Sequence, residues 1–337
     1  MTFIPASAPA FLLEGRFDEA SPAGPVAIWQ GSRIHLEFEG AGIELKFADA
    51  KGQNFFNAIV DGRTTLISLC EGKPAQGTLI DGLGKGRHRL TLFKRSEAAA
   101  GTVRFMGASL PRGANVFPAK KPQTTFRLQF FGDSITAGAC NEDGTTDQWE
   151  DRRTHNNASS YAALTADALK ADYRNIAVSG MGITTGWVEM KAHQIWDRTY
   201  PAPTSPGADL NRWIPDVLCV NLGENDDSFS KANHRDFPSA DYTSGMMSLI
   251  QSIRTAYPSA QIVLLRGGMF GGAKSEPLRA AWEKAVAQLE AYDRRVSHFV
   301  FEHWSATHPR VADHRAMADE LSAWLRHQPF VPTLTSP

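Results

Sequence analysis

The spacing of apolar residues changes between residues 110 and 126, and this change constrains the fold more than any other feature. Before it, apolar and polar residues alternate, as in Ile34–Phe38, Ile43–Phe47 and Leu90–Leu92. A period of two turns one face of a strand toward a core and the other toward water. Asp61-Gly62 is a hairpin-type turn signal, and no convincing helical pattern interrupts the alternation. We therefore predict an N-terminal all-β domain, a jelly roll or sandwich.

From about Phe126 the pattern becomes an alternation of short apolar runs and helical periodicity. Helical faces carry apolar residues at spacings of three and four, within 242–257, 278–289 and 317–325. A strand-helix-strand order predicts a parallel sheet with helices on both faces. The predicted strands are Leu128–Phe131, Ile176–Val178, Val217–Leu222, Ile262–Leu265 and Phe299–Phe301.

The proline-containing segment Pro111–Pro122 separates the two patterns and is predicted to be a linker. We place the β domain at residues 1–115 and the second domain at residues 116–337. A length of 337 residues suits two domains, and 42% hydrophobic with 21% charged residues is typical of a globular chain.

Charge and cysteine content argue against several classes of function. The formal net charge is −1, so neither a nucleic acid nor an anionic membrane is an expected partner. No apolar run is long enough to span a bilayer.

Cys70, Cys140 and Cys219 form neither a disulfide framework nor a zinc pattern. Met1–Pro5 lacks the start of a secretory signal, so we expect either an intracellular protein or one whose leader precedes this sequence. Oligomeric state cannot be read from these features.

Chemistry-bearing residues follow four predicted strands. Gly132–Thr136 follows the first, Ser179–Gly182 the second, Gly223–Asp226 the third, and His308-Pro309 the last. Functional residues collect at the carboxyl ends of parallel strands. A hydroxyl, a glycine amide, a carboxamide and an imidazole are thus expected at one edge of the sheet. Each motif alone also fits a turn, an N-cap or a loop, but their order together favours an acyl-transfer site.

The role of each group follows from its chemistry. Ser134 becomes a nucleophile when a base removes its proton, and His308 is a base of suitable strength. The amides of Ser134 and Gly180 and the side chain of Asn225 are candidate donors to the oxyanion. No cluster has metal-ligand spacing, and such a reaction needs no cofactor.

These motifs resemble the SGNH (GDSL-type) hydrolase superfamily over about the last 210 residues. The resemblance implies a three-layer α/β/α fold and ester hydrolysis through Ser134 and His308, with Gly180 and Asn225 in the oxyanion hole. The stretches Trp29–Ser32, Asn54–Phe56, Val60–Gly62 and His88–Glu97 look like the jelly-roll domain of carbohydrate esterase family 2. That likeness implies removal of acetyl groups from polysaccharides such as xylan or glucomannan, often at a 6-hydroxyl.

The acid that normally orients the histidine is missing from its usual place. Family members often carry Asp three residues before the histidine, where this sequence has Ser305. We favour a backbone carbonyl as the partner of His308 Nδ1, as in family 2 members that work with a Ser-His dyad, with Glu302 as the alternative. His303, expected on the strand, and His314, expected on the next helix, are competitors for the base role.

Substrate-contacting residues are harder to select. Trp304, Trp187 and Glu224 are candidates because flat rings pack on sugars and carboxylates accept from hydroxyls. Each equally fits packing or a solvated loop. Besides a carbohydrate acetylesterase, the sequence allows a catalytically impaired carbohydrate-binding protein and a lipase or lysophospholipase of the same fold.

Overall fold

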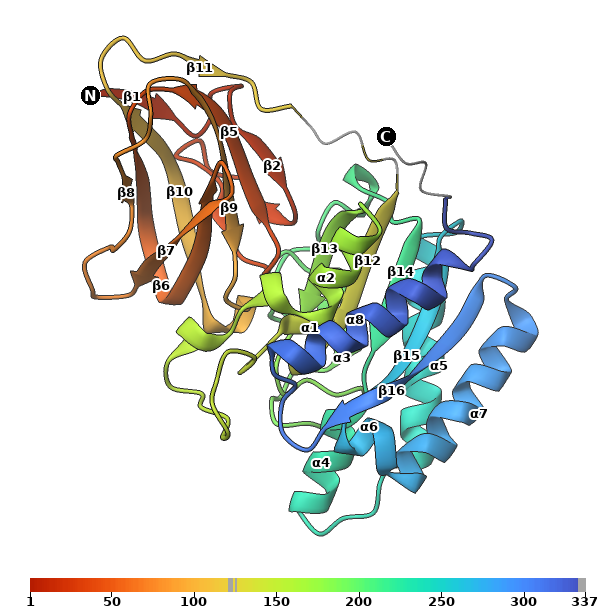
Figure 1. The fold of residues 1–337 in the computed structure, drawn as a ribbon. Helices are drawn as coiled ribbons and strands as arrows, with labels where there is room; N and C mark the ends of the chain where they lie inside the picture. The colour runs from red at the N-terminus through yellow and green to blue at the C-terminus, as the bar shows by residue number, and fades with distance from the viewer. Residues whose placement is uncertain (121–123, 125, 333–337) are drawn as a thin grey trace. The chain divides into compact units, whose positions relative to one another are not determined.

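Each of the two sequence patterns forms its own unit in the computed structural model (Figure 1). The structure describes residues 1–120, 124 and 126–332. The first unit comprises Met1–Gln123 together with Glu150–Arg153, and the second comprises Thr124–Trp149 and Thr154–Pro337. Lys121 and Pro122 of the predicted linker lie outside the described residues, and the domain boundary between residues 115 and 116 stays a prediction. Among the described residues, no helix combines the length and apolar character that crossing a bilayer requires.

The first unit is an antiparallel sheet with 11 strands in the described residues, which confirms the all-β prediction. It curls around a core that includes the alternating residues Ile34, Leu36 and Phe38. The long strand β6 pairs with β10 through its first half and with β7 and β9 through its second half. The strands are β1 (Thr2–Pro5), β2 (Leu12–Glu14), β3 (Phe17–Asp18), β4 (Val26–Ala27), β5 (Arg33–Glu39), β6 (Ile43–Val60), β7 (Arg63–Cys70), β8 (Leu79–Ile80), β9 (Arg87–Lys94), β10 (Gly101–Leu110) and β11 (Val116–Phe117).

A four-residue segment distant in sequence belongs to this β unit. Arg152 Nη1 lies 3.1 Å from Glu97 Oε1, and Glu97 is buried. Gln53 Nε2 donates to the Glu150 carbonyl over 2.7 Å, and its Oε1 accepts from the Arg152 N–H. Glu150–Arg153 is therefore held in the β unit by both side-chain and backbone hydrogen bonds.

The second unit has a parallel sheet of order β13-β12-β14-β15-β16, as predicted. All five predicted apolar runs lie in or overlap these strands. Helix α2 packs with α8, and α5 packs with α7 (Figure 1). The strands are β12 (Arg127–Gly132), β13 (Asp172–Ala177), β14 (Val217–Asn221), β15 (Gln261–Met269) and β16 (Val296–Ser305); the helices are α1 (Ser134–Ala137), α2 (Tyr161–Ala168), α3 (Ala192–Ile195), α4 (Glu224–Ala232), α5 (Ser239–Ala256), α6 (Phe270–Lys274), α7 (Glu276–Tyr292) and α8 (Val311–Arg326).

The strand order determines where the site lies. The chain runs from β12 outward to β13, then returns to the other side of β12 with β14. This reversal is a topological switch point, where open α/β sheets bind ligands at the carboxyl ends of their strands. Ser134 follows β12 directly and therefore lies at this point.

Candidate active site

Ser134 is the first residue of α1, immediately after β12. The preceding Asp133 caps this short helix, because its Oδ1 accepts from the Ile135 N–H over 3.0 Å. At Gly132 a Cβ would lie 2.2 Å from Thr136 Oγ1, so only glycine fits the end of the strand. The tight strand-helix turn thus places the Ser134 hydroxyl at the edge of the sheet.

The hydroxyl of Ser134 contacts the imidazole of His308, which lies in the loop between β16 and α8. Ser134 Oγ and His308 Nε2 are 2.9 Å apart, although 174 positions separate them in sequence. The other ring nitrogen, His308 Nδ1, lies 2.6 Å from Asp147 Oδ2. Serine, histidine and aspartate therefore form a continuous hydrogen-bonded chain, the arrangement of a catalytic triad.

Asp147 replaces the partner that the sequence suggested for His308. The prediction of a backbone carbonyl is wrong: a carboxylate from the loop between α1 and α2 occupies Nδ1. The alternative Glu302 is exposed on β16, where its backbone N–H donates to Glu320 Oε2. The acid thus comes from a different segment, about midway between α1 and the first residues of α2.

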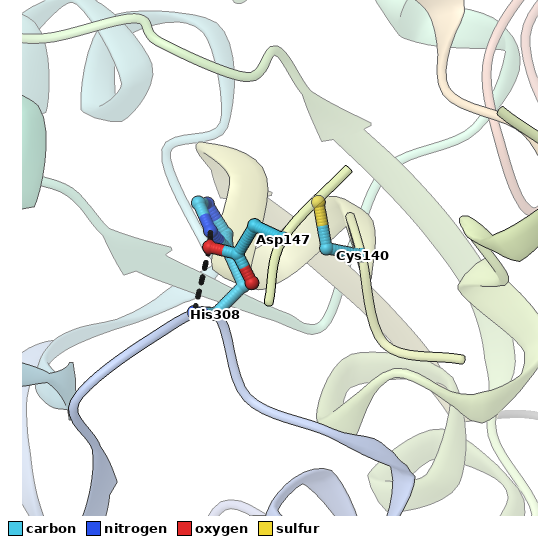
Figure 2. A group of neighbouring side chains, drawn as sticks. All are labelled: Cys140, Asp147 and His308. Carbon is cyan, nitrogen blue, oxygen red and sulfur yellow. Dashed lines mark hydrogen bonds and ion pairs between the residues drawn. The ribbon is translucent and has the colours of Figure 1, made fainter. Parts of the chain in front are cut away.

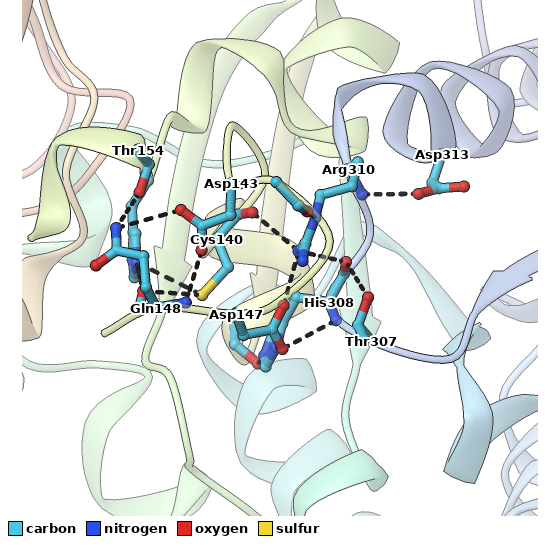
Figure 3. Close-up of polar contacts among 12 residues, drawn as sticks. Cys140, Asp143, Asp147, Gln148, Thr154, Thr307, His308, Arg310 and Asp313 are labelled. Carbon is cyan, nitrogen blue, oxygen red and sulfur yellow. Dashed lines mark hydrogen bonds and ion pairs between the residues drawn. The ribbon is translucent and has the colours of Figure 1, made fainter. Parts of the chain in front are cut away.

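The electrostatic surroundings keep Asp147 ionised. Burial raises the pKa of this carboxyl, but hydrogen bonds from His308 and Arg310 outweigh burial and hold the pKa well below its usual range. Arg310 Nη1 donates to Asp147 Oδ1 over 2.7 Å, while Oδ2 faces the imidazole (Figures 2 and 3). A charged carboxylate at Nδ1 leaves Nε2 as the nitrogen that accepts a proton from Ser134.

The two competing histidines make other contacts. His303 lies on β16, and its Nε2 is 2.8 Å from Asp313 Oδ1. His314 lies on α8 and is buried, and its Nδ1 accepts from the Tyr161 N–H over 3.1 Å. Because Ser134 Oγ contacts Nε2 of His308, His308 is the imidazole that the structure brings to the hydroxyl.

Gly180 lies in the loop after β13, with a φ of 81° that favours glycine. Its carbonyl accepts from the Trp187 N–H, and an added Cβ would lie 3.1 Å from Trp187 Cβ. Asp226 ties this loop to α4, because its carboxylate accepts from the N–H groups of Ile183, Thr184 and Thr185. The loop that carries Gly180 is therefore anchored from the helix that carries Asn225.

Asn225 lies at the start of α4 and is buried beside the nucleophile turn. Its Nδ2 donates to Asp133 Oδ2 over 3.0 Å and to the Met181 carbonyl over 3.1 Å. Burial raises the pKa of Asp133 to about 8, although the hydrogen bond from Ile135 opposes this. The carboxamide is thus held between the turn of Ser134 and the loop of Gly180.

Candidate substrate-contacting residues have different surroundings. Trp187 is 56% exposed, and its Nε1–H donates to Ser228 Oγ over 3.0 Å. Trp304 packs against Phe270 with ring centroids 6.0 Å apart. The carboxylate of Glu224 accepts from the N–H groups of Gly271 and Gly272 over 3.0 and 2.8 Å. The ring of Trp149 lies beside the base, with its centroid 5.0 Å from that of His308.

Cys140 lies beside the triad, and its position raises the question of metal binding. Among the described residues, Cys140 forms one group of possible ligands with Asp147 and His308 (Figure 2), and another with Asp143 and His155. Burial raises the pKa of the Cys140 thiol, and the carboxylates of Asp147 and Asp143 raise it further. Cys140 Sγ lies 3.5 Å from the Gln148 carbonyl oxygen and 3.6 Å from His155 Nε2, and Asp147 and His308 are hydrogen-bonded to each other. We therefore assign these side chains to the hydrogen-bond network.

Comparisons with known proteins place this geometry in a family. Models described as "Carbohydrate esterase 2 N-terminal" and "GDSL-like Lipase/Acylhydrolase family" match residues 13–119 and 130–327. A solved family two carbohydrate esterase from Clostridium thermocellum, in complex with cellohexaose, is 31% identical with a TM-score of 0.82, covering 94% of this chain and 98% of that one. The chain belongs to carbohydrate esterase family 2.

Two curated relatives of this family 2 member bear names that describe ester chemistry. Cellulase/esterase CelE of Acetivibrio thermocellus is 33% identical over 95% of this chain, which spans 40% of the CelE length. An acetylxylan esterase / glucomannan deacetylase of Cellvibrio japonicus is 27% identical over 93% of this chain and 90% of its own. The two family models cover both units, so the resemblance seen in the sequence is confirmed at the level of the family.

Sequence reasoning missed two residues that surround the base in this family 2 member: Asp147 and Arg310. Asp147 lies in a polar loop with no regular periodicity, where several other acidic residues are equally eligible. Arg310 lies two residues after His308, a proximity that identifies it as a neighbour without indicating its contacts. Only the arrangement of the loops distinguishes these residues.

Proposed function

We propose that this chain is a serine esterase that removes O-acetyl groups from carbohydrate. The observation that carries the proposal is the contact of 2.9 Å between Ser134 Oγ and His308 Nε2, with Asp147 on the far nitrogen. A hydroxyl with a base on one side, and a base oriented by a carboxylate, is the constellation of acyl-transfer enzymes.

In the acylation step, Ser134 Oγ bonds to the acetyl carbonyl carbon as His308 Nε2 takes its proton. The carbonyl oxygen becomes an oxyanion, for which the N–H groups of Ser134 and Gly180 and the Asn225 carboxamide are the proposed donors. Asp147 stabilises the imidazolium. The bond from carbon to the sugar oxygen then breaks, and His308 returns the proton to that oxygen.

In the deacylation step, water gives a proton to His308 while its oxygen attacks the acetyl-Ser134 carbon. The ester bond to Ser134 Oγ breaks, Ser134 regains a proton from His308, and acetate leaves. Asn225 directs its two hydrogens to Asp133 and the Met181 carbonyl in this structure. The oxyanion would compete with the Met181 carbonyl for one of them, since catalytic hydrogen bonds often shorten only in the complex.

The carbohydrate part of the proposal is supported by the named relatives and by one aromatic ring. Trp187 is exposed, its indole N–H is fixed by Ser228, and its backbone N–H donates to the Gly180 carbonyl. This combination suits a flat platform for a sugar next to the oxyanion donors. Acetylated xylan or glucomannan, with 6-O-acetyl groups among the positions attacked, are the proposed substrates. Roles for Trp304 and Glu224 in binding stay predictions.

The decisive experiment measures hydrolysis of a set of esters by the wild type and by Ser134→Ala. The set contains p-nitrophenyl acetate, butyrate and octanoate, with acetylated xylan and glucomannan followed by acetate release and by NMR of the 6-O-acetyl signals. Ser244→Ala, on the exposed face of α5, is the matched control. We expect acetyl esters to be hydrolysed and Ser134→Ala alone to abolish turnover. Sugar binding without turnover would instead indicate an impaired binding protein, and a preference for the octanoate would indicate a lipase.

A further inference from the structure

Arg310 joins the two segments that must meet for the triad to form. Its Nη1 donates to Asp147 Oδ1 over 2.7 Å and to the Cys140 carbonyl over 3.0 Å, and its Nε donates to the Gly144 carbonyl over 2.8 Å. All three acceptors lie on the loop between α1 and α2, which carries the acid. Figure 3 shows the guanidinium between this loop and the segment of His308.

The same guanidinium is also tied to the segment that carries the base. Nη1 donates to the His308 carbonyl over 2.9 Å, and the backbone N–H of Arg310 donates to Asp313 Oδ2 over 2.8 Å, at the start of α8. The Val311 N–H donates to the Asn141 carbonyl over 3.0 Å. The Arg310 side chain, fixed at the helix start, and the Val311 backbone therefore hold the acid-bearing loop against the base-bearing loop.

The geometry at Asp147 shows what this contact does. A carboxylate has two equivalent oxygens and can rotate about its terminal bond, so one partner alone fixes its position poorly. Arg310 takes Oδ1, while Oδ2 accepts from the imidazole and, over 3.3 Å, from the His308 backbone N–H. Because the loop has no regular secondary structure around Asp147, these contacts determine how the carboxylate faces His308, and the guanidinium holds the oxygen on the far side.

Burying the guanidinium of Arg310 lowers the stability of the folded chain in one respect. Within the part of the chain that the structure describes, its buried Nη2 has no hydrogen-bond partner. An unsatisfied buried donor has a free-energy cost, because it has lost its hydrogen bond to water and gained none in the protein. A guanidinium that tolerates this cost while holding the acid fits a role in the reaction better than a role in stability.

We propose that Arg310 is the positioning residue of the triad: it orients Asp147 toward His308. The proposal rests on the esterase activity proposed above. Other titratable groups near this pair are Cys140, Asp143, Glu224, Asp313 and His314, all of which stay unchanged in the variants below.

The first test compares Arg310→Met, which keeps the length of the side chain, with Arg315→Met, an exposed position on the same helix. We expect kcat of Arg310→Met on p-nitrophenyl acetate to fall about 10- to 100-fold with KM changed less than about threefold. Arg315→Met should match the wild type. A fall in Tm that accounts for the lost activity, or a change confined to KM, would overturn the proposal.

A double-mutant cycle asks whether Arg310 acts through Asp147. In the Asp147→Asn background, Arg310→Met should cost less than about threefold further in kcat, because the residue to be positioned is no longer an acid. Losses that multiply fully would mean that Arg310 acts independently of Asp147.

Guanidinium chloride, far below denaturing concentrations, should restore part of the activity of Arg310→Ala, and absence of rescue in a folded Arg310→Ala would count against the proposal.

A measurement without turnover separates this proposal from the proposed function. The proton between His308 Nδ1 and Asp147 gives a low-field imidazole signal by NMR when the pair is held together. We expect that signal in the wild type and its loss or broadening in Arg310→Met. A wild type that hydrolyses no ester but shows this difference would refute the esterase and retain the positioning role. An unchanged signal in Arg310→Met would refute the positioning role whatever the activity.

Discussion

Asp147 Oδ2 lies 2.6 Å from His308 Nδ1, although 161 positions separate the two residues in sequence. The carboxylate approaches from the loop between α1 and α2, while the imidazole follows the last strand of the sheet. Its Oδ1 is bound by Arg310, so both oxygens of the acid are engaged. The position three residues before the histidine, where the resemblance to SGNH hydrolases led us to expect the acid, is Ser305 here. The triad is thus completed from a segment that no local motif marks.

Replacing the acid tests this relationship directly. Asp147→Asn preserves the shape but removes the charge that selects the imidazole tautomer, so kcat should fall about 10²- to 10⁴-fold. The matched control is Glu302→Gln, which changes the carboxylate that the sequence offered as the alternative. Steady-state kinetics on p-nitrophenyl acetate measure both. Full activity in Asp147→Asn, or a larger loss in Glu302→Gln, would refute the assignment.

The oxyanion role of Asn225 predicts a loss confined to the chemical step. Asn225→Ala removes a donor held by Asp133 beside Ser134, and we expect kcat to fall about 10²- to 10³-fold with a small change in KM. Asn233→Ala, at the other end of α4, removes a side chain that caps the helix over the Phe229 carbonyl and serves as the control. Equal kcat values for the two variants would remove Asn225 from the oxyanion hole.

If the exposed ring of Trp187 binds sugar, replacing it should raise KM for polymeric substrates but not for small esters. Trp187→Ala should raise KM for acetylated xylan or glucomannan about 10-fold, because the sugar loses an apolar surface to pack on. Hydrolysis of p-nitrophenyl acetate should change little. Tyr292→Ala, which alters another exposed aromatic at the end of α7, is the control. An equal effect of Trp187→Ala on both substrates would indicate a structural role in the Gly180 loop.

His314 predicts a pH dependence of stability that is separate from catalysis. Burial lowers the pKa of His314 to about 3 in the folded protein, below its ordinary value near 6.5. As the pH falls below 6.5, the unfolded chain binds a proton that the folded chain excludes, so the free energy of unfolding decreases down to about pH 3. The contribution of His314 to this decrease approaches roughly 4 kcal/mol.

Urea denaturation at pH 7 and pH 4 measures this contribution. His314→Asn keeps an acceptor for the Tyr161 N–H and removes the titrating group, so its stability should fall less between the two pH values than that of the wild type. His327→Asn, exposed after α8, should behave like the wild type. Identical pH dependence in wild type and His314→Asn would show that His314 does not resist protonation.

Strand β15 is longer in the structure than the apolar run that predicted it. The apolar run ends at Leu265, yet the strand continues through Arg266, Gly267 and Gly268 to Met269. The Arg266 guanidinium is largely buried and donates to the Gly272 carbonyl, a partner that only the folded chain supplies. The pairing register with β16 shifts between Arg266 and Gly268. The spacing of apolar residues gives no sign of this shift.

The sequence by itself determined the two-part architecture and the residues at the strand ends. Alternation and helical spacing are local properties, and parallel strands bring their carboxyl ends together whatever the loops do. Ser134, Gly180, Asn225 and His308 could therefore be chosen as candidates from their places after four of the five parallel strands. Tertiary structure alone decided that Asp147 is the acid and that Arg310 holds it. Both contacts join irregular loops far apart in the chain, where neither period nor spacing limits which of several carboxylates comes within reach of the imidazole.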